Sequence, residues 1–114
     1  MDIKLYNIVA VVNSGHSDLV VSIAKELGAQ GGTIIPANGS VTDEAVKLYG
    51  IGIHPEKEII MILVKEELVT PILEKLYDKA GNSSDAQGIF FTLPVTHASD
   101  NLLAEYKNKP NKEQ

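Results

Sequence analysis

The sequence predicts an α+β fold made of two similar βαβ halves. Two segments carry apolar residues at helical spacing, and each lies between two β-rich apolar runs, so the expected order is β, α, β, β, α, β. The two helical segments share nearly the same apolar spacing. The chain has 114 residues, of which 44% are hydrophobic and 22% charged, as in a single globular domain. We therefore expect a ferredoxin-like βαββαβ sandwich, with one sheet and both helices on one of its faces.

The first half begins with a β-rich run over residues 5–12, which predicts a buried strand. The apolar residues of 19–27 recur at helical spacing, so a helix follows, with Ser17 or Asp18 as its candidate N-cap. Gly28 stands where the glycine that ends a helix is expected.

Residues 31–35 predict a short second strand, which Pro36 is expected to end. The connection over residues 37–54 is long for so small a chain, and such connections usually carry a function. Within it we expect a short helix over 42–49, because its first turn holds two acidic residues.

The second half repeats the pattern. Residues 59–64 are the most apolar run of the sequence and predict a central strand. A second helix is expected over 66–77, with apolar positions that include Tyr77 and with Pro71 in its first turn, where a missing N–H does little harm. Residues 89–93 predict the last strand, closed by the proline that follows.

The domain is expected to cover residues 1–98, followed by a charged C-terminal tail over 99–114. The strands are apolar at nearly every residue, so both faces of the sheet need cover. The two helices cover one face, and no further element is left for the other. The sequence therefore predicts an oligomer.

Composition excludes several kinds of protein. The formal charge of −5 argues against a nucleic-acid partner, because such binding needs a basic surface. The absence of cysteine excludes disulfides and thiolate chemistry and favours a cytoplasmic location. No run approaches the ~20 apolar residues that cross a bilayer, and the N-terminal apolar run is too short for a signal peptide.

No pattern of catalytic residues stands out. The sequence has no nucleophile elbow, phosphate-loop signature or dinucleotide fingerprint, and its paired acids lie where helices begin, so we expect no enzyme. His16, His54 and His97 lack the helical spacing of a metal motif, and no metal site is predicted within one chain. A metal site assembled across subunits stays open.

Two glycine-bearing loops are candidates for ligand binding. Residues 28–33 either form a helix cap and tight turn or let a flat ligand approach the backbone at Gly31 and Gly32. Residues 82–88 are rich in groups that can hydrogen-bond an anion, but short polar residues are also typical of any exposed loop.

The order and spacing of these features resemble the PII signal-transduction family from about Ile3 to Val95. The most telling residues are Gly31-x-Thr33, and Gly88 followed by Leu93-Pro94-Val95. CutA-like trimers share the same plan.

The resemblance implies a homotrimer that binds an adenine nucleotide in clefts between subunits and docks its long loop, residues 37–54, onto a membrane transporter, an enzyme or a regulator. Positions that correspond to the adenine site are Val11, Gly31, Thr33 and Leu63. Positions that correspond to the phosphate site are Lys57, Gln87 and Gly88. The docking loop includes Asn38, Gly39, Tyr49 and His54.

The sequence departs from nitrogen-sensing members in its charges. Ile89 replaces the lysine after the loop glycine, Asp100 and Leu102 replace basic residues, and Met61 replaces the acid that faces the base. Each lost charged phosphate contact is worth about 1.5–3 kcal/mol, so a triphosphate should bind weakly. The expected effector is therefore an adenine nucleotide, from the set ATP, ADP, AMP and cyclic AMP, and a nucleotide with fewer charges is favoured over a triphosphate. A different small ligand is the other expectation. The alternative is a CutA-like metal-binding trimer that uses its histidines.

Overall fold

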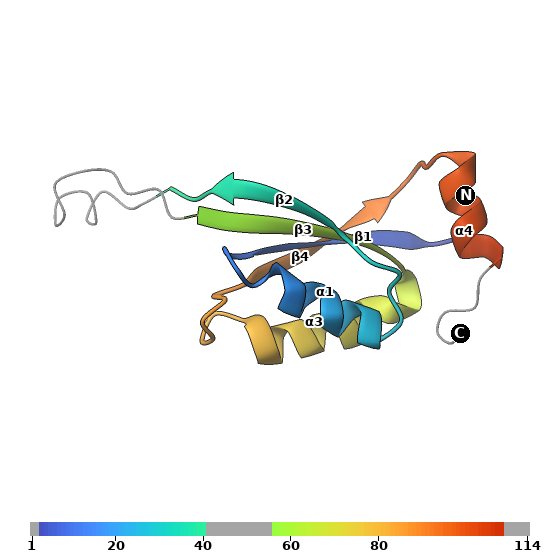
Figure 1. Ribbon diagram of the computed structural model, residues 1–114. Helices are drawn as coiled ribbons and strands as arrows, with labels where there is room; N and C mark the ends of the chain where they lie inside the picture. The colour runs from blue at the N-terminus through green and yellow to red at the C-terminus, as the bar shows by residue number, and fades with distance from the viewer. Residues whose placement is uncertain (1–2, 41–55, 109–114) are drawn as a thin grey trace, which may run out of the picture.

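The computed structural model describes residues 3–40 and 56–108. Its elements, in chain order, are β1 (Leu5–Asn13), α1 (Ser17–Glu26), β2 (Thr33–Asn38), β3 (Glu56–Lys65), α3 (Glu66–Ala80), β4 (Ile89–Val95) and α4 (Asp100–Asn108). The strands form one antiparallel sheet in the order β2-β3-β1-β4, and α1 and α3 lie side by side on one face (Figure 1). This confirms the ferredoxin-like α+β fold. None of the described helices is both long enough and apolar enough to span a bilayer.

The core lies between the sheet and the two helices. Its fully buried side chains alternate along the strands and recur at helical spacing on α1 and α3. They include Ile8, Val12, Val20, Ile60, Ile62, Val64, Ile72 and Leu76. Burying each such aliphatic side chain contributes about 1.5–3 kcal/mol, so this layer is the main source of the fold's stability.

Both outer strands run through a proline. We expected Pro36 and Pro94 to end their strands, but Pro36 pairs with Glu58 inside β2 and Pro94 pairs with Tyr6 inside β4. Each of these strands has a neighbour on one side only. A proline is tolerated there because its missing N–H can lie on the unpaired side.

The helices differ from the sequence prediction in three details. Pro71 is the sixth residue of α3 rather than part of its first turn. Tyr77, expected on the apolar face, is 74% exposed and meets the ring of Phe90 edge to face. His16, rather than Ser17 or Asp18, is the N-cap of α1. Gly28 does follow the end of α1 with a φ of +118°, as predicted.

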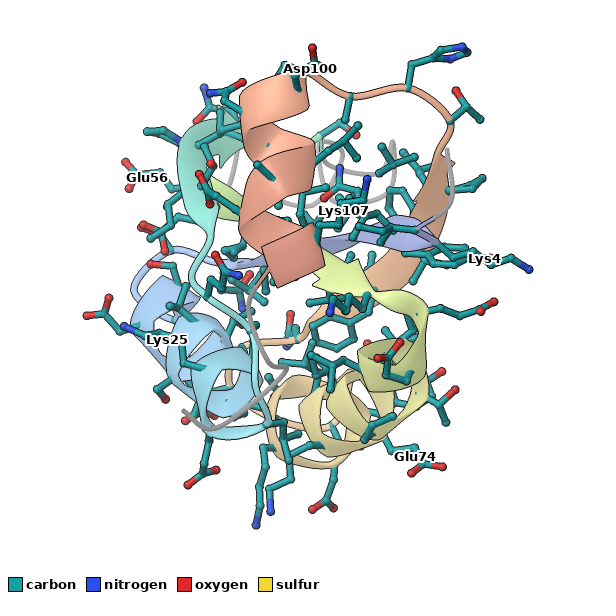
Figure 2. The ribbon with its side chains drawn as sticks, turned by 90° about the vertical axis from the view of Figure 1, so that its right-hand side faces the viewer. Lys4, Lys25, Glu56, Glu74, Asp100 and Lys107 are labelled. Atoms are coloured by element: carbon teal, nitrogen blue, oxygen red, sulfur yellow. The ribbon has the colours of Figure 1, made fainter. Side chains whose placement is uncertain are left out.

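The helix α4 was missed by the sequence analysis, which assigned residues 99–114 to a tail. It stands at one end of the sheet, on the side away from α1 and α3 (Figures 1 and 2). Tyr106 attaches it, since this side chain is only 8% exposed and its hydroxyl donates to the carbonyl of Leu63 at 2.8 Å. The boundary of the domain at residue 98 stays a prediction.

The sheet face opposite α1 and α3, formed by the odd-numbered residues of the strands, is here called the open face. Strand register brings apolar side chains of all four strands together on it. Ile89, Phe91 and Leu93 of β4 are 63%, 46% and 50% exposed there. An apolar surface of this kind is unusual for a monomer and marks an interaction surface.

Candidate functional site

The predicted ligand-binding residues lie in two groups. Gly31, Thr33 and Leu63 line a cavity of about 400 Å³ between the sheet and α4, here called the α4 pocket. Its full lining is Asn7, Gln30, Gly31, Gly32, Thr33, Met61, Leu63, Glu105 and Tyr106. Lys57 lies at the other end of β3, close to the loop that precedes Gln87 and Gly88.

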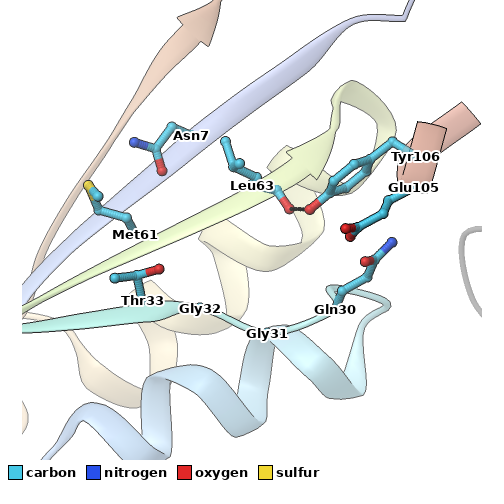
Figure 3. A pocket seen from close by; sticks show the side chains of 9 residues that line it. All are labelled: Asn7, Gln30, Gly31, Gly32, Thr33, Met61, Leu63, Glu105 and Tyr106. Carbon is cyan, nitrogen blue, oxygen red and sulfur yellow. Dashed lines mark hydrogen bonds between the residues drawn. The ribbon is translucent and has the colours of Figure 1, made fainter. Parts of the chain in front are cut away.

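The walls of the α4 pocket come from four parts of the chain. Asn7 and Leu63 pair across β1 and β3, and Met61 pairs with Thr33 across β3 and β2, so these four side chains share the open face. Figure 3 shows the segment of Gln30 on one side of the cavity and α4 on the other.

Gly31 leaves room at the mouth of this pocket. A Cβ placed on Gly31 would meet no atom within 4 Å, and the residue has a φ of +153°, which other residues rarely adopt. By contrast, a Cβ on Gly32 would lie 3.1 Å from Cγ1 of Ile62. Gly28 ends α1, as the helix-cap interpretation of the 28–33 loop predicted, and Gly31 borders a cavity. The approach of a flat ligand to the backbone at Gly31 and Gly32 stays a prediction.

The polar side chains of the α4 pocket are two amides, two hydroxyls and one carboxylate. Its lining includes no lysine, arginine or histidine, and Glu105 is its one carboxylate. Oδ1 of Asn7 is buried without a hydrogen-bond partner, the one such side-chain atom in the described part of the chain. Burial, and secondly the carboxylate of Glu105, raise the pKa of Tyr106 above its usual value. The Tyr106 hydroxyl therefore stays protonated and keeps donating to Leu63 at neutral pH.

The second group, here called the Lys57 cluster, ties β3 to the loop before β4. The Lys57 ammonium donates to Oδ1 of Asn13 at 2.7 Å, and Nδ2 of Asn13 donates to the carbonyl of Asp85 at 2.9 Å. The backbone N–H of Asn13 also donates to the carbonyl of Ala86 at 2.9 Å. These bonds hold a cation beside the turn that leads to Gln87.

Gln87 and Gly88 complete this turn. Gln87 is exposed and has a φ of +47°. Gly88 is buried, and a Cβ there would collide with the carbonyl oxygen of Ala80 and the ring of Phe90. Gly88 therefore has a packing role of its own, whereas the Gln87 side chain is accessible to a ligand.

A second cavity of about 340 Å³ borders the Lys57 cluster at the base of the long loop. Its lining is Ser14, Pro36, Ala37, Asn38, Glu56, Lys57 and Glu58. Oε1 of Glu58 accepts hydrogen bonds from the N–H groups of Gly15 and Ser17, at 3.1 and 3.3 Å. This carboxylate occupies the N-terminal end of α1, which would otherwise attract an anion.

Val11, the remaining adenine-site candidate, lies between the two groups on the open face and pairs with Ile59 and Ile89. The pairs Thr33–Met61 and Ala37–Lys57 are four residues apart, which is ~13 Å along a strand. One face of the sheet thus carries both groups, at a separation that only an extended ligand can span.

The docking-loop residues are only partly described. Asn38 ends β2 and lines the second cavity, and Gly39 follows it half-buried. Tyr49, His54 and the helix expected over 42–49 lie outside the described residues.

The described histidines do not converge. His16 precedes α1, and Nδ1 of its ring lies 3.2 Å from the carbonyl of Asn13. His97 follows β4 at the opposite end of the sheet, 3.2 Å from the hydroxyl of Thr96. Residues 3–40 and 56–108 contain no group of three or more side chains placed to hold a metal ion.

Sequence analysis missed Asn7, Gln30, Glu105 and Tyr106 as lining residues of the α4 pocket. Asn7 carried a signal, because it is the one amide within the β-rich run over residues 5–12. The α4 residues carried none, since their role depends on a helix folding back over the sheet.

Comparisons with solved structures place the fold among PII-like and CutA proteins. A PII-like signalling protein from Thermus thermophilus is 25% identical, with a TM-score of 0.63 over 83% of this chain and 90% of that one. The nitrogen regulatory PII-like protein CPII from Thiomonas intermedia, solved with ADP, AMP and bicarbonate, is 19% identical, with a TM-score of 0.61 over 81% and 90%. CutA from Synechococcus elongatus is 9% identical, with a TM-score of 0.70 over 92% and 88%.

A comparison with curated proteins found no match. The family model described as nitrogen regulatory protein P-II matches residues 5–100, which span all four strands, α1 and α3. This match covers most of the chain and confirms the resemblance noted in the glycine loops and strand order. The chain belongs to the nitrogen regulatory protein P-II family.

Proposed function

We propose that this chain is a non-catalytic PII-like regulator that binds an adenine nucleotide and signals to a partner protein through residues 37–54. The observation that carries the proposal is the placement of the α4 pocket and the Lys57 cluster on one face of the sheet. The pocket offers a cavity beside a glycine without steric obstruction, and the cluster offers a cation for a phosphate.

The active form in this proposal is a cytoplasmic homotrimer. Its support is the open face, where Ile89, Phe91 and Leu93 are exposed. Two further copies of the chain would cover this surface and bring their own residues to the edge of each ligand site. Sedimentation or light scattering should give a particle of about three times 12.3 kDa. A monomer at micromolar concentration would contradict the trimer.

The charges favour a nucleotide with few phosphates. The second cavity is lined by Lys57 and also by Glu56 and Glu58, so its lining has one cationic and two acidic side chains. The extra phosphates of ATP should therefore add little affinity over AMP, ADP or cyclic AMP. Isothermal titration with all four nucleotides tests this directly. The absence of heat and of thermal stabilisation with every one of them would overturn nucleotide binding.

The partner of the long loop would be a membrane transporter, an enzyme or a regulator. A ligand that binds two conformations of the loop with different affinity would shift their populations and so control docking. Affinity capture with and without the nucleotide tests this step, and the recovered partner should depend on the nucleotide.

A CutA-like metal-binding trimer is the alternative, and the likeness in fold to CutA is its support. It requires His16, His54 or His97 from different subunits to meet, because His16 and His97 lie at opposite ends of one sheet. Metal analysis of the purified trimer before and after treatment with a chelator would reveal such a site.

A further inference from the structure

We infer that Asn38 is a site of spontaneous modification, at which the side-chain amide is converted to a carboxylate by way of a cyclic imide. Asparagine is among the chemically labile residues of proteins, and Asn38 is the one asparagine of the sequence that a glycine follows. The reaction needs only water and the neighbouring peptide group. The modification itself is independent of the proposed function, whereas its effect on nucleotide binding rests on that function.

The reaction first joins the two residues and then opens the ring with water. The backbone nitrogen of Gly39 attacks Cγ of Asn38, and the side-chain nitrogen leaves as ammonia with the proton of the Gly39 N–H. Water then adds to either carbonyl of the imide. Cleavage at Cγ gives aspartate, and cleavage at the backbone carbonyl gives isoaspartate. The net reaction consumes water and releases ammonia.

The structure leaves these two residues accessible to the reaction. Asn38 is exposed and is the last residue of β2, and Gly39 belongs to no helix or strand. Because Gly39 has no Cβ, its nitrogen can approach Cγ of Asn38 without obstruction from its own side chain. Asn13 differs, since its side-chain amide is held by Lys57 at 2.7 Å and by the carbonyl of Asp85 at 2.9 Å.

The new carboxylate would stand directly opposite another acid. Asn38 pairs with Glu56 across β2 and β3, and Figure 1 shows the end of β2 beside the start of β3, at the end of the sheet away from α4. Like charges directly opposite one another destabilise an antiparallel pair. Asn38 also lines the second cavity, so its carboxylate would join those of Glu56 and Glu58 around the Lys57 ammonium. The modification should therefore weaken the attraction of this cavity for a phosphate.

The isoaspartate product changes the backbone as well as the charge. Its main chain runs through the former side chain, which inserts a methylene at the last residue of β2. Under the proposed function, Asn38 belongs to the docking segment of residues 37–54. Both products would thus alter that segment irreversibly at the point where it leaves β2.

Peptide mapping by mass spectrometry tests the modification on the full chain, aged in mildly alkaline buffer. The peptide that contains Asn38 should exchange NH2 for OH with time and give two products that separate by chromatography. Asn82, which is exposed and followed by serine, is the internal control and should keep its amide over the same interval. Gly39→Ala should slow the conversion because its Cβ hinders the attacking nitrogen, and Asn38→Gln should slow it because a larger ring must close. Conversion at Asn38 no faster than at Asn82, or an unchanged rate in Gly39→Ala, would overturn the inference.

Titration calorimetry tests the effect of the added charge. Asn38→Asp should bind AMP about two- to fivefold more weakly than the native chain, the factor expected for a further unit charge at ~4–8 Å in water. Adenosine, which lacks the phosphate, should bind both chains equally. Equal AMP affinity in the two chains would overturn the effect on the cavity but not the modification. Failure of the native chain to bind AMP would overturn the proposed function together with this effect, while the peptide map still decides the modification.

Discussion

Tyr106 should hold α4 in place, and replacing it with alanine should release the helix without unfolding the domain. The helix α4 has nine residues, fewer than the ~12–15 that an isolated helix needs to be stable in water. Its stability must therefore come from contacts with the rest of the chain. Tyr106 is the one buried side chain among residues 101–107.

The magnitude follows from the burial and from one hydrogen bond. Truncating a buried aromatic side chain to alanine costs about 3–5 kcal/mol. Because α4 lies outside the core between the sheet and α1 and α3, this cost should fall on the local opening of α4. A loss of about 3 kcal/mol corresponds to roughly a hundredfold faster exchange of the α4 amides. Tyr106→Phe removes only the bond to Leu63 and should accelerate exchange by about two- to tenfold.

Hydrogen exchange followed by mass spectrometry measures this effect peptide by peptide. Exchange in α4 should rise in Tyr106→Ala, while exchange in β1 and β3 should stay unchanged. Tyr77→Ala is the matched control, because Tyr77 is 74% exposed on α3 and its removal should leave α4 unaffected. Unchanged α4 exchange in Tyr106→Ala, or an equal rise in Tyr77→Ala, would refute the reasoning.

Three further predictions address pH, packing and charge. The pKa of Tyr106 is raised in the folded chain, so its contribution to stability is fully present below its usual pKa of 10.0 and is lost as the pH rises through the folded pKa. The exchange rate of the α4 amides, corrected for the intrinsic effect of pH, should therefore rise further at alkaline pH in the native chain but not in Tyr106→Phe. Gly88→Ala should lower the free energy of unfolding by about 1–3 kcal/mol, because its Cβ would collide with the Ala80 carbonyl and the Phe90 ring, and a denaturation midpoint equal to that of the native chain would contradict this. Lys57→Met should weaken AMP binding by about tenfold or more but leave adenosine binding within about twofold, and an equal loss for both would show that Lys57 acts through the fold and not on the phosphate.

Much of the fold could be predicted from the sequence because local signals and burial agree. The periodicity of α1 and α3 and the apolar runs of β1 and β3 point to the same layers that the structure contains. The errors arose where tertiary context decides. Pro36 and Pro94 end a strand only if both sides of that strand are paired, and sequence alone does not reveal which strands lie at an edge.

The candidate site was only half predictable for the same reason. Gly31 and Thr33 belong to a loop with a recognisable pattern, so the cavity wall that they form was anticipated. Glu105 and Tyr106 belong to a short polar helix whose position depends on a single buried side chain. A segment of nine residues is too short for the periodicity of its apolar residues to distinguish such a helix from a charged tail.

The distribution of charge links the two halves of the site. Glu58 places a carboxylate at the N-terminal end of α1, where it accepts from the N–H groups of Gly15 and Ser17. This negative charge offsets the attraction of that helix end for a phosphate and leaves Lys57 as the cation of the cluster. Lys57 in turn is held by Asn13, which also binds the loop before Gln87. A phosphate that draws Lys57 away from Asn13 would break the bond that links β3, through Asn13 of β1, to that loop. Under the proposed function, occupancy of the cluster would thereby be felt at the start of β3, the strand that follows residues 37–54 in the chain.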